Sequence, residues 1–421
     1  MSGVKLCIHR AADTIGGNCI EIMAPGGERI LLDAGRPLDT PDDEITPAPA
    51  SLDIDGPVLG VLLSHAHTDH CGLLEALPAD WPIFCGEATE VLLKLSAALR
   101  KGSIRQHCNH WQSGKPLVIA PFTITPYLID HSAFDAYALQ IDVGGKRILY
   151  SGDFRAHGRK AKLTAALIHK PPKNLDALIM EGTNLQSSGA SIKGTTTEDE
   201  LEKDFGRLFR ETKGRVFVSW SSTNIDRTVT LYKACKDNGR ILVPDIFCMM
   251  VLMQLGKFAK GLPQPEWENK YMRAVVTSRM KFLAERLGEP EIVENLIKYR
   301  SAMSAVKLAE TPEKWVVMAR NSLIDDFSRK GVIPDENDTW VWSQWKGYLE
   351  QESSQAMKDF FAPCRMEYIH SSGHASHDVL QRFAGAMNAK ALIPVHGEAW
   401  DVHTSMFQSI VLCQNGQWIT V

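Results

Sequence analysis

Short apolar runs, separated by turns rich in glycine and proline, dominate the first half of the chain. Such runs, rich in β-branched and aliphatic residues, are typical of strands. Five strands are predicted here, at residues 20–23, 29–33, 58–64, 138–143 and 147–150. Residues 87–101 instead repeat their apolar positions at helical spacing and predict a helix.

The pattern changes near residue 198, where helical and strand-like segments begin to alternate. Helices are predicted at 200–210 and 228–238, and buried strands at 215–219 and 240–243. Alternation of this kind indicates a small parallel α/β unit. Residues 257–300 look mostly helical. From residue 365 short strands return, joined by a helix at 378–387.

The composition is that of an ordinary globular protein. The 421 residues suit two or three domains, and 44% hydrophobic with 23% charged residues excludes disordered, collagen-like and coiled-coil classes. A net charge of −4 argues against a protein that holds nucleic acid by bulk charge alone. Residues 206–364 carry 24 Lys and Arg against 20 Asp and Glu. Ordinary solvated surface explains this small positive excess at least as well as a nucleic-acid-binding surface does.

Cysteine usage and hydropathy bear on location. The nine cysteines are scattered and form no C-x-x-C pair, as expected of reduced thiols in the cytoplasm. The chain starts without the apolar run of a signal peptide, and residues 246–253, its most apolar stretch, are too short to span a bilayer. We therefore expect a soluble, cytoplasmic protein without a membrane partner.

Residues 65–70 place four metal-binding side chains directly after an apolar run: His65, His67, Asp69 and His70. Imidazoles and carboxylates are ligands of zinc and similar ions. Because side chains alternate along an extended backbone, His65 and His67 point to one side, and the other two can turn to a second position. A polar surface turn is the alternative, but the spacing favours a site for two metals.

Three further residues follow apolar strands in the same way: His131, Asp153 and His396. Each alone would more often cap a turn. Their shared context, an apolar strand followed by a ligand and a turn, suggests that they meet at one edge of a sandwich. Two metals held about 3.5–4 Å apart activate water and stabilise a phosphoryl transition state.

Together these motifs resemble a known family. Asp33, residues 65–70, His131 and Asp153 resemble the first four motifs of the metallo-β-lactamase superfamily. Residues 179–184, 370–376 and 394–398 resemble motifs A, B and C of the β-CASP nucleases, with motif B in its RNase J-like form. The resemblance implies an α/β fold: a metallo-β-lactamase αββα sandwich with an inserted β-CASP α/β domain. Residues 1–205 and 365–421 would form the sandwich, and 206–364 the insertion.

The resemblance also implies roles for residues. His65, His67 and His131 would hold one zinc, and Asp69, His70 and His396 a second, with Asp153 as the bridge; manganese is an alternative metal. Asp33 would orient a ligand from the second coordination shell. The residues expected to take part in catalysis are Asp69, His374 as the general acid and Glu181 as its partner.

Substrate phosphates are expected at two motifs. His370, Ser372 and Gly373 would bind them within motif B. Ser221, Asn224 and Arg227 follow a predicted strand and could do so at a helix N-terminus. A helix cap beside a solvated arginine accounts for this second group equally well.

One segment departs from the family pattern. Where RNase J-like proteins carry a Gly-Ser-Gln-Gly-Glu loop, residues 340–347 keep only Ser343-Gln344, surrounded by Trp340, Trp342 and Trp345. These rings could stack on the bases of a single strand, or pack in the core, which is the commoner fate of tryptophan. Residues 107–110, rich in histidine, are expected to form a surface loop.

The leading hypothesis is a two-zinc ribonuclease that cleaves single-stranded RNA, with RNA favoured over DNA. A DNA nuclease, a phosphodiesterase for small substrates and a non-catalytic metal-bearing subunit remain as alternatives. The sequence leaves endonuclease and exonuclease modes open. The resemblance also suggests a homodimer.

Overall fold

The chain folds into two compact units. The computed structural model describes residues 3–421 except 41–44, 101, 186–194, 265–269, 277 and 287. The first unit combines Met1–Thr195 with Gly373–Val421, and the second is Thr196–Ser372. The chain thus leaves the first unit, forms the second, and returns.

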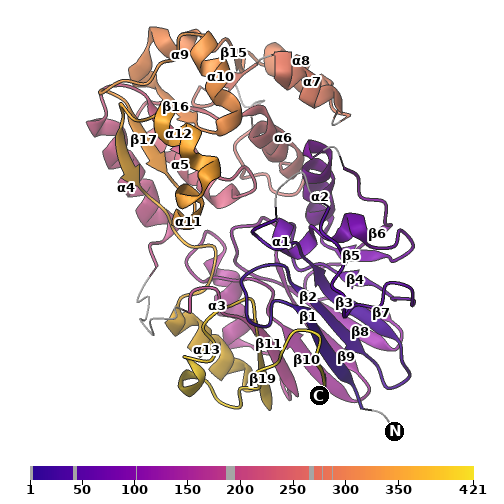
Figure 1. Ribbon diagram of the computed structural model, residues 1–421. Helices are drawn as coiled ribbons and strands as arrows, with labels where there is room; N and C mark the ends of the chain where they lie inside the picture. Colours follow the sequence, from indigo (N-terminus) through magenta and orange to yellow (C-terminus); the bar gives the residue numbers. More distant parts are fainter. Residues whose placement is uncertain are drawn as a thin grey trace. The chain divides into compact units, whose positions relative to one another are not determined.

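Two sheets build the first unit (Figure 1). One has the order β20-β1-β2-β3-β4-β5-β6, made of Trp418–Thr420, Lys5–Arg10, Cys19–Met23, Arg29–Ala34, Val61–Leu62, Ile83–Cys85 and Cys108–His110. The other has the order β19-β11-β10-β9-β8-β7, made of Ala391–Val395, Ala177–Glu181, Lys146–Tyr150, Tyr137–Val143, Phe122–Leu128 and Leu117–Ile119.

Alternating side chains explain why these sheets stack. In β11, Ala177 and Ile179 enter the core between the two sheets, whereas Leu178 and Met180 enter the layer beneath the helices. The helices α3 (Ala161–His169) and α13 (His377–Met387) cover that outer face (Figure 1). Strands that are apolar on both faces need cover on both. The result is the predicted αββα sandwich.

The remaining helices of this unit are short, apart from α2. They are α1 (Thr68–Cys71), α2 (Glu87–Leu99) and the 3-10 turns η1 (Leu74–Ala76) and η4 (Thr404–Met406).

A five-stranded parallel sheet forms the second unit, in the order β13-β16-β12-β17-β18. Its strands are Ile241–Val243, Trp315–Met318, Val216–Ser219, Thr339–Trp342 and Arg365–Tyr368, and a small pair adds β14 (Ala274–Val275) and β15 (Ala302–Met303). Its helices are α4 (Glu198–Glu211), α5 (Ile225–Asp237), α6 (Ile246–Leu255), α7 (Ser278–Arg286), α8 (Glu291–Lys298), α9 (Lys307–Glu310), α10 (Asn321–Arg329), α11 (Lys346–Glu350) and α12 (Gln355–Phe360), with η2 (Pro312–Lys314) and η3 (Glu352–Ser354).

The structure changes several expected bounds. The strand predicted at 58–64 is reduced to β4, Val61–Leu62. Residues 257–300 are not mostly helical: they contain turns and β14 as well as α7 and α8, and parts of this range lie outside the described residues. The second unit extends beyond the predicted 206–364, because 206 falls within α4 and β18 pairs with β17.

None of the helices in the described part of the chain is both long and apolar enough to cross a bilayer.

Candidate metal centre

The predicted ligands lie together in the first unit, five on loops that follow its strands and two, Asp69 and His70, in α1. Their donor atoms form two groups, each with all members within 4.8 Å of one another. The first group is His65, His67 and His131, and the second is Asp69, His70, Asp153 and His396. Residues that follow β4, β8, β10 and β19, together with two from α1, therefore meet at one edge of the sandwich.

The three histidines of the first group face one another. His131 Nε2 lies 3.1 Å from His67 Nδ1, and the centre of the His65 ring is 4.6 Å from that of His131. Two nitrogens bound to one tetrahedral zinc at 2.0–2.1 Å would be roughly 3.3 Å apart, which fits this spacing. The other nitrogen of His131, Nδ1, donates a hydrogen bond to the carbonyl of Gly373 at 2.7 Å. This bond places the proton on Nδ1, so the lone pair of Nε2 can bind a metal.

Asp153 joins the two groups. Its Oδ2 lies 2.9 Å from His70 Nε2 and 3.9 Å from His65 Nε2, and its Oδ1 lies 2.8 Å from His396 Nδ1. Asp69 completes the second group, with its Oδ2 3.6 Å from His396 Nε2. Both oxygens of this carboxylate therefore face the second group, and Oδ2 also approaches the first group.

Several of these buried atoms have no hydrogen-bond partner among the described residues: His65 Nε2, Asp153 Oδ1 and both ring nitrogens of His396. The close approach of His396 Nδ1 to Asp153 Oδ1 lacks the alignment of a hydrogen bond. Unsatisfied buried polar atoms are costly, and here they point into one small volume. A donor set of this kind fits a metal cofactor.

Electrostatics favour the same conclusion. Burial, together with the neighbouring histidines, holds the pKa of His65 and His131 well below the usual value, and burial lowers the pKa of His67 to about 4. These imidazoles are therefore neutral, as metal binding requires. Burial alone would raise the pKa of Asp153, but His396, His70 and His374 hold it well below its usual value, so the carboxylate is ionised.

Asp33 holds His70 from behind. Its Oδ2 accepts from His70 Nδ1 at 2.7 Å, and its Oδ1 accepts from the backbone N–H of Ser64 at 2.7 Å. The Tyr150 hydroxyl donates to the same Oδ2 at 2.6 Å and itself accepts from Asn18 Nδ2 at 2.9 Å. Sequence reasoning missed Tyr150 and Asn18; the only available signal was that Tyr150 closes the strand just before Asp153.

Unusual backbone conformations surround the site. Asp33, Gly152 and His396 have φ angles of 57°, 53° and 51°, in the left-handed region that most side chains avoid. A side chain at Gly152 would also come within 2.8 Å of the Tyr137 carbonyl. Strain of this kind persists where the surrounding structure fixes it, and it commonly marks functional sites.

His374 stands beside the metal-binding groups. Its Nδ1 lies 3.0 Å from Glu181 Oε2 and 3.7 Å from Asp153 Oδ2. Burial alone would lower the pKa of His374, but the Glu181 and Asp153 carboxylates outweigh it and raise the pKa to about 9. Glu181 is fixed in turn, because its Oε1 accepts from the Phe154 N–H at 2.9 Å. The imidazole therefore keeps its proton at neutral pH.

Comparison with known proteins agrees with this geometry. A beta-lactamase superfamily domain matches residues 28–218, and a Zn-dependent metallo-hydrolase RNA specificity domain matches residues 363–402. Ribonuclease J of Helicobacter pylori (strain B128) is 24% identical over 416 residues, which cover 94% of this chain and 56% of that protein. Ribonuclease J of Sinorhizobium meliloti is 22% identical over 80% of this chain and 57% of that protein.

The chain thus combines a metallo-β-lactamase superfamily domain with an RNA specificity domain of Zn-dependent metallo-hydrolases, and over 94% of its length it is similar to a Ribonuclease J. It spans little more than half the length of the curated relatives that it matches. A solved protein of unknown function from Enterococcus faecalis V583 shares the fold, with a TM-score of 0.75 at 18% identity and full coverage of both chains.

The residues expected to bind phosphate are divided between the units. Gly373 lies in the first unit, where its carbonyl fixes His131. The other five belong to the second unit: Ser221, Asn224, Arg227, His370 and Ser372. Ser221 is exposed, and Asn224 caps α5 by accepting from the Arg227 N–H at 3.0 Å. His370 and Ser372 are half-buried, just after β18.

The structure contradicts the phosphate-binding role of Arg227. Its side chain is completely buried and pairs with Glu198 at 3.3 Å. The same guanidinium donates to the Ser343 carbonyl at 3.1 Å. The Arg227 guanidinium is inaccessible to solvent and already paired, so it cannot bind a phosphate that arrives from solvent. In this protein Arg227 is a structural residue.

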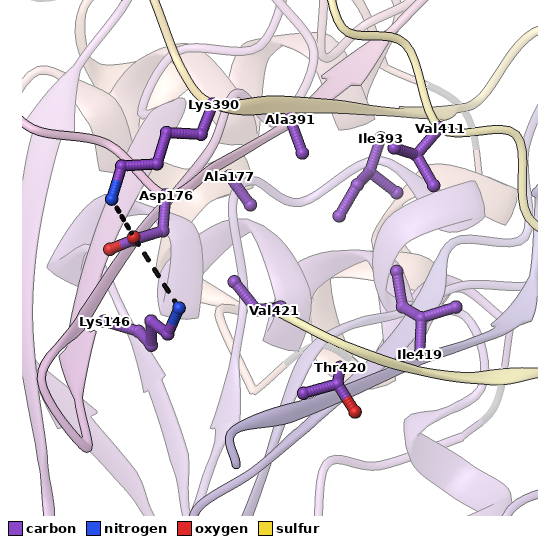
Figure 2. A pocket seen from close by; sticks show the side chains of 10 residues that line it. All are labelled: Lys146, Asp176, Ala177, Lys390, Ala391, Ile393, Val411, Ile419, Thr420 and Val421. Atoms are coloured by element: carbon purple, nitrogen blue, oxygen red, sulfur yellow. Dashed lines mark hydrogen bonds and ion pairs between the residues drawn. The ribbon is translucent and has the colours of Figure 1, made fainter.

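A separate hollow in the first unit contains none of the predicted site residues (Figure 2). Its volume is about 270 Å³, and its walls include Ala177, Ile393 and Ile419. Lys390 and Lys146 approach Asp176 Oδ1 at 2.8 and 3.8 Å at its rim. The paired charges leave a mainly apolar hollow that is unrelated to the metal centre.

Proposed function

We propose that the protein is a metal-dependent ribonuclease that cleaves single-stranded RNA with the help of two zinc ions. The observation that carries the proposal is the convergence of seven predicted ligands with the Glu181–His374 pair beside them. The names of the relatives and of the RNA specificity domain support RNA as the substrate.

His65, His67 and His131 would hold one ion, and Asp69, His70 and His396 the other, with Asp153 shared between them. Bound divalent ions acidify water and stabilise the charge that develops on a phosphoryl group. Zinc is proposed because imidazole nitrogens dominate the donor set, although manganese accepts the same ligands.

His374 supplies the proton in this proposal. Its raised pKa keeps the imidazole protonated, and Glu181 holds Nδ1, so Nε2–H is the proton available for the leaving oxygen. Proton donation of this kind typically contributes a factor of about 10²–10⁴ to the rate. Glu181 acts through His374, as a positioning residue.

The deciding experiment compares cleavage of end-labelled single-stranded RNA and DNA of one sequence, with zinc or manganese. The wild-type protein is expected to cleave RNA, and His374→Ala to lose about 10²–10⁴-fold in rate while keeping its bound metal. His169→Ala, at an exposed histidine of α3, is the matched control and should cleave normally. The product ladder distinguishes internal from terminal cleavage.

Cleavage of DNA alone would replace this proposal with a DNA nuclease. The proposal would fail if neither the RNA nor the DNA were cleaved by protein that carries two metals per chain. A phosphodiesterase for small substrates or a non-catalytic metal-bearing subunit would then remain.

Two further properties belong to the proposal. We propose a cytoplasmic location, supported by nine free cysteines, of which Cys7, Cys19 and Cys71 are among the buried ones. We also propose a homodimer, supported by the family resemblance, for which analytical ultracentrifugation is the test.

A further inference from the structure

The segment that departs from the family pattern lies at one edge of the second unit's sheet. Residues 340–347 comprise the last three residues of β17, the loop that follows it and the first two residues of α11. In parallel α/β sheets, ligands bind beyond the carboxyl ends of the strands. The loops after β17 and β18 are both at this edge, because the two strands are parallel neighbours.

The three tryptophans of this segment have different environments. Trp340 and Trp342 are buried in the core of the unit, and Trp340 stacks on Phe361 with ring centres 5.2 Å apart. Trp345 is 57% exposed. Packing therefore explains the first two rings, whereas the third presents a large apolar surface to solvent.

Trp345 is held in place although it is exposed. Its carbonyl accepts from Trp342 Nε1 at 3.1 Å, and its ring meets the edge of Tyr348 with centres 5.3 Å apart. A side chain at Gly347 would collide with the indole ring, so the indole lies directly against that glycine. A ring fixed in this way loses little conformational entropy when a ligand stacks on it.

The edge strand β18, which neighbours β17, also carries exposed apolar side chains. Tyr368 is 48% exposed and Met366 46%. Tyr368 is paired in register with the buried Trp342, and Ser343 Oγ donates to the Ile369 carbonyl at 2.6 Å, which ties the two loops together. We call Trp345, Tyr348, Met366 and Tyr368 the aromatic edge.

The surrounding charge is modest. Lys346 is exposed beside Trp345, whereas the Arg365 guanidinium on β18 is paired with Glu367. A surface that gripped phosphates would need several unpaired cations. Flat exposed rings beside few cations suit ligands with π-faces, and every nucleobase offers such a face once a strand is unpaired.

We propose that the aromatic edge binds the unpaired bases of a single nucleic-acid strand, with Trp345 as the main stacking platform. This inference rests on the proposed function, because it names how the same substrate is held.

The test measures binding of labelled oligomers by fluorescence anisotropy, with the full chain and its metals, in a His374→Ala background that prevents cleavage. The probes are oligo(rA), oligo(rU) and an abasic ribose-phosphate oligomer of the same length. Trp345→Ala is expected to weaken oligo(rA) binding by roughly 5- to 100-fold, and Trp345→Phe by much less. Affinity for the abasic oligomer should not change. Trp418→Ala, at a partly exposed tryptophan of the first unit, is the matched control.

An equal loss for base-bearing and abasic oligomers would overturn the proposal, because that result indicates general damage or a phosphate contact. Unchanged affinity for all three would overturn it as well. A change in sedimentation without a change in binding would assign the edge to contact between copies. Base-dependent loss in a protein whose parent cleaves no RNA would support the stacking site while the proposed nuclease activity fails.

Discussion

At the scale of single residues, Asp33 shows how one carboxylate organises a metal centre. It accepts hydrogen bonds from His70, Tyr150 and Ser64 and is itself completely buried. Such partners fix the orientation of a ligating imidazole and increase its basicity. Its backbone φ of 57° is tolerated by asparagine, so the charge can be removed without disturbing the chain.

We therefore predict that Asp33→Asn lowers metal affinity by about 10- to 100-fold. Competition with a chromogenic chelator measures the affinity, and Asp401→Asn, at an exposed aspartate, is the control. Metal affinity equal to that of the wild type would show that His70 is oriented without the charge of Asp33.

The sequence revealed residues of this site unevenly. His131, Asp153 and His396 could be proposed as ligands because each comes shortly after an apolar strand. Tyr150 could not, because its link to Asp33 depends on the pairing of segments 117 positions apart. Arg227 was assigned the wrong role because an arginine in a polar motif looks solvated, and its burial becomes visible only when α5 is packed.

At the scale of elements, a buried ion pair between Arg227 and Glu198 links α5 to α4. Glu198, in the first turn of α4, forms an ion pair with the Arg227 guanidinium and accepts a hydrogen bond from the Thr230 hydroxyl at 2.7 Å. Removing one member of a buried ion pair leaves an uncompensated charge, which typically costs about 3–5 kcal/mol.

Arg227→Met is accordingly predicted to lower the free energy of unfolding by about 3–5 kcal/mol, as measured by urea denaturation. Replacing both partners, in Glu198→Gln/Arg227→Met, should recover part of the loss. Arg207→Met, at an exposed ion pair on α4, should cost less than about 1 kcal/mol. Full stability combined with weakened RNA binding would restore the phosphate-binding role.

Long elements were predictable and small ones were not. The helix α13 differs from its expected range by one residue, because its apolar stripe is regular. The strand β14 has only two residues, and its partner β15 lies beyond two helices in the chain. Pairing over that distance leaves no periodic signal, which is why residues 257–300 were expected to be mostly helical.

At the scale of the whole molecule, all seven predicted metal ligands belong to one of the two units. Binding to the folded state alone stabilises whatever part of the chain forms the site. Chelation of the metal should therefore loosen the first unit and leave the second unchanged. Hydrogen exchange followed by mass spectrometry, with and without chelator, measures the protection of backbone amides in each unit separately.

Protection is expected to fall in peptides from residues 45–185 and 373–421 and to stay constant in peptides from 195–264 and 288–372. An equal loss in both regions would contradict this prediction, and so would no loss anywhere.

The division of the first unit along the chain has a consequence during protein synthesis. His374 and His396 are translated only after the whole second unit, as is β19, which completes one sheet of the sandwich. Domains generally fold as they emerge from the ribosome, so the second unit can fold while the first is still unfinished. A nascent chain whose second unit has just folded therefore still lacks His374 and His396, and the metal-binding groups are completed only after residue 396 has been synthesised.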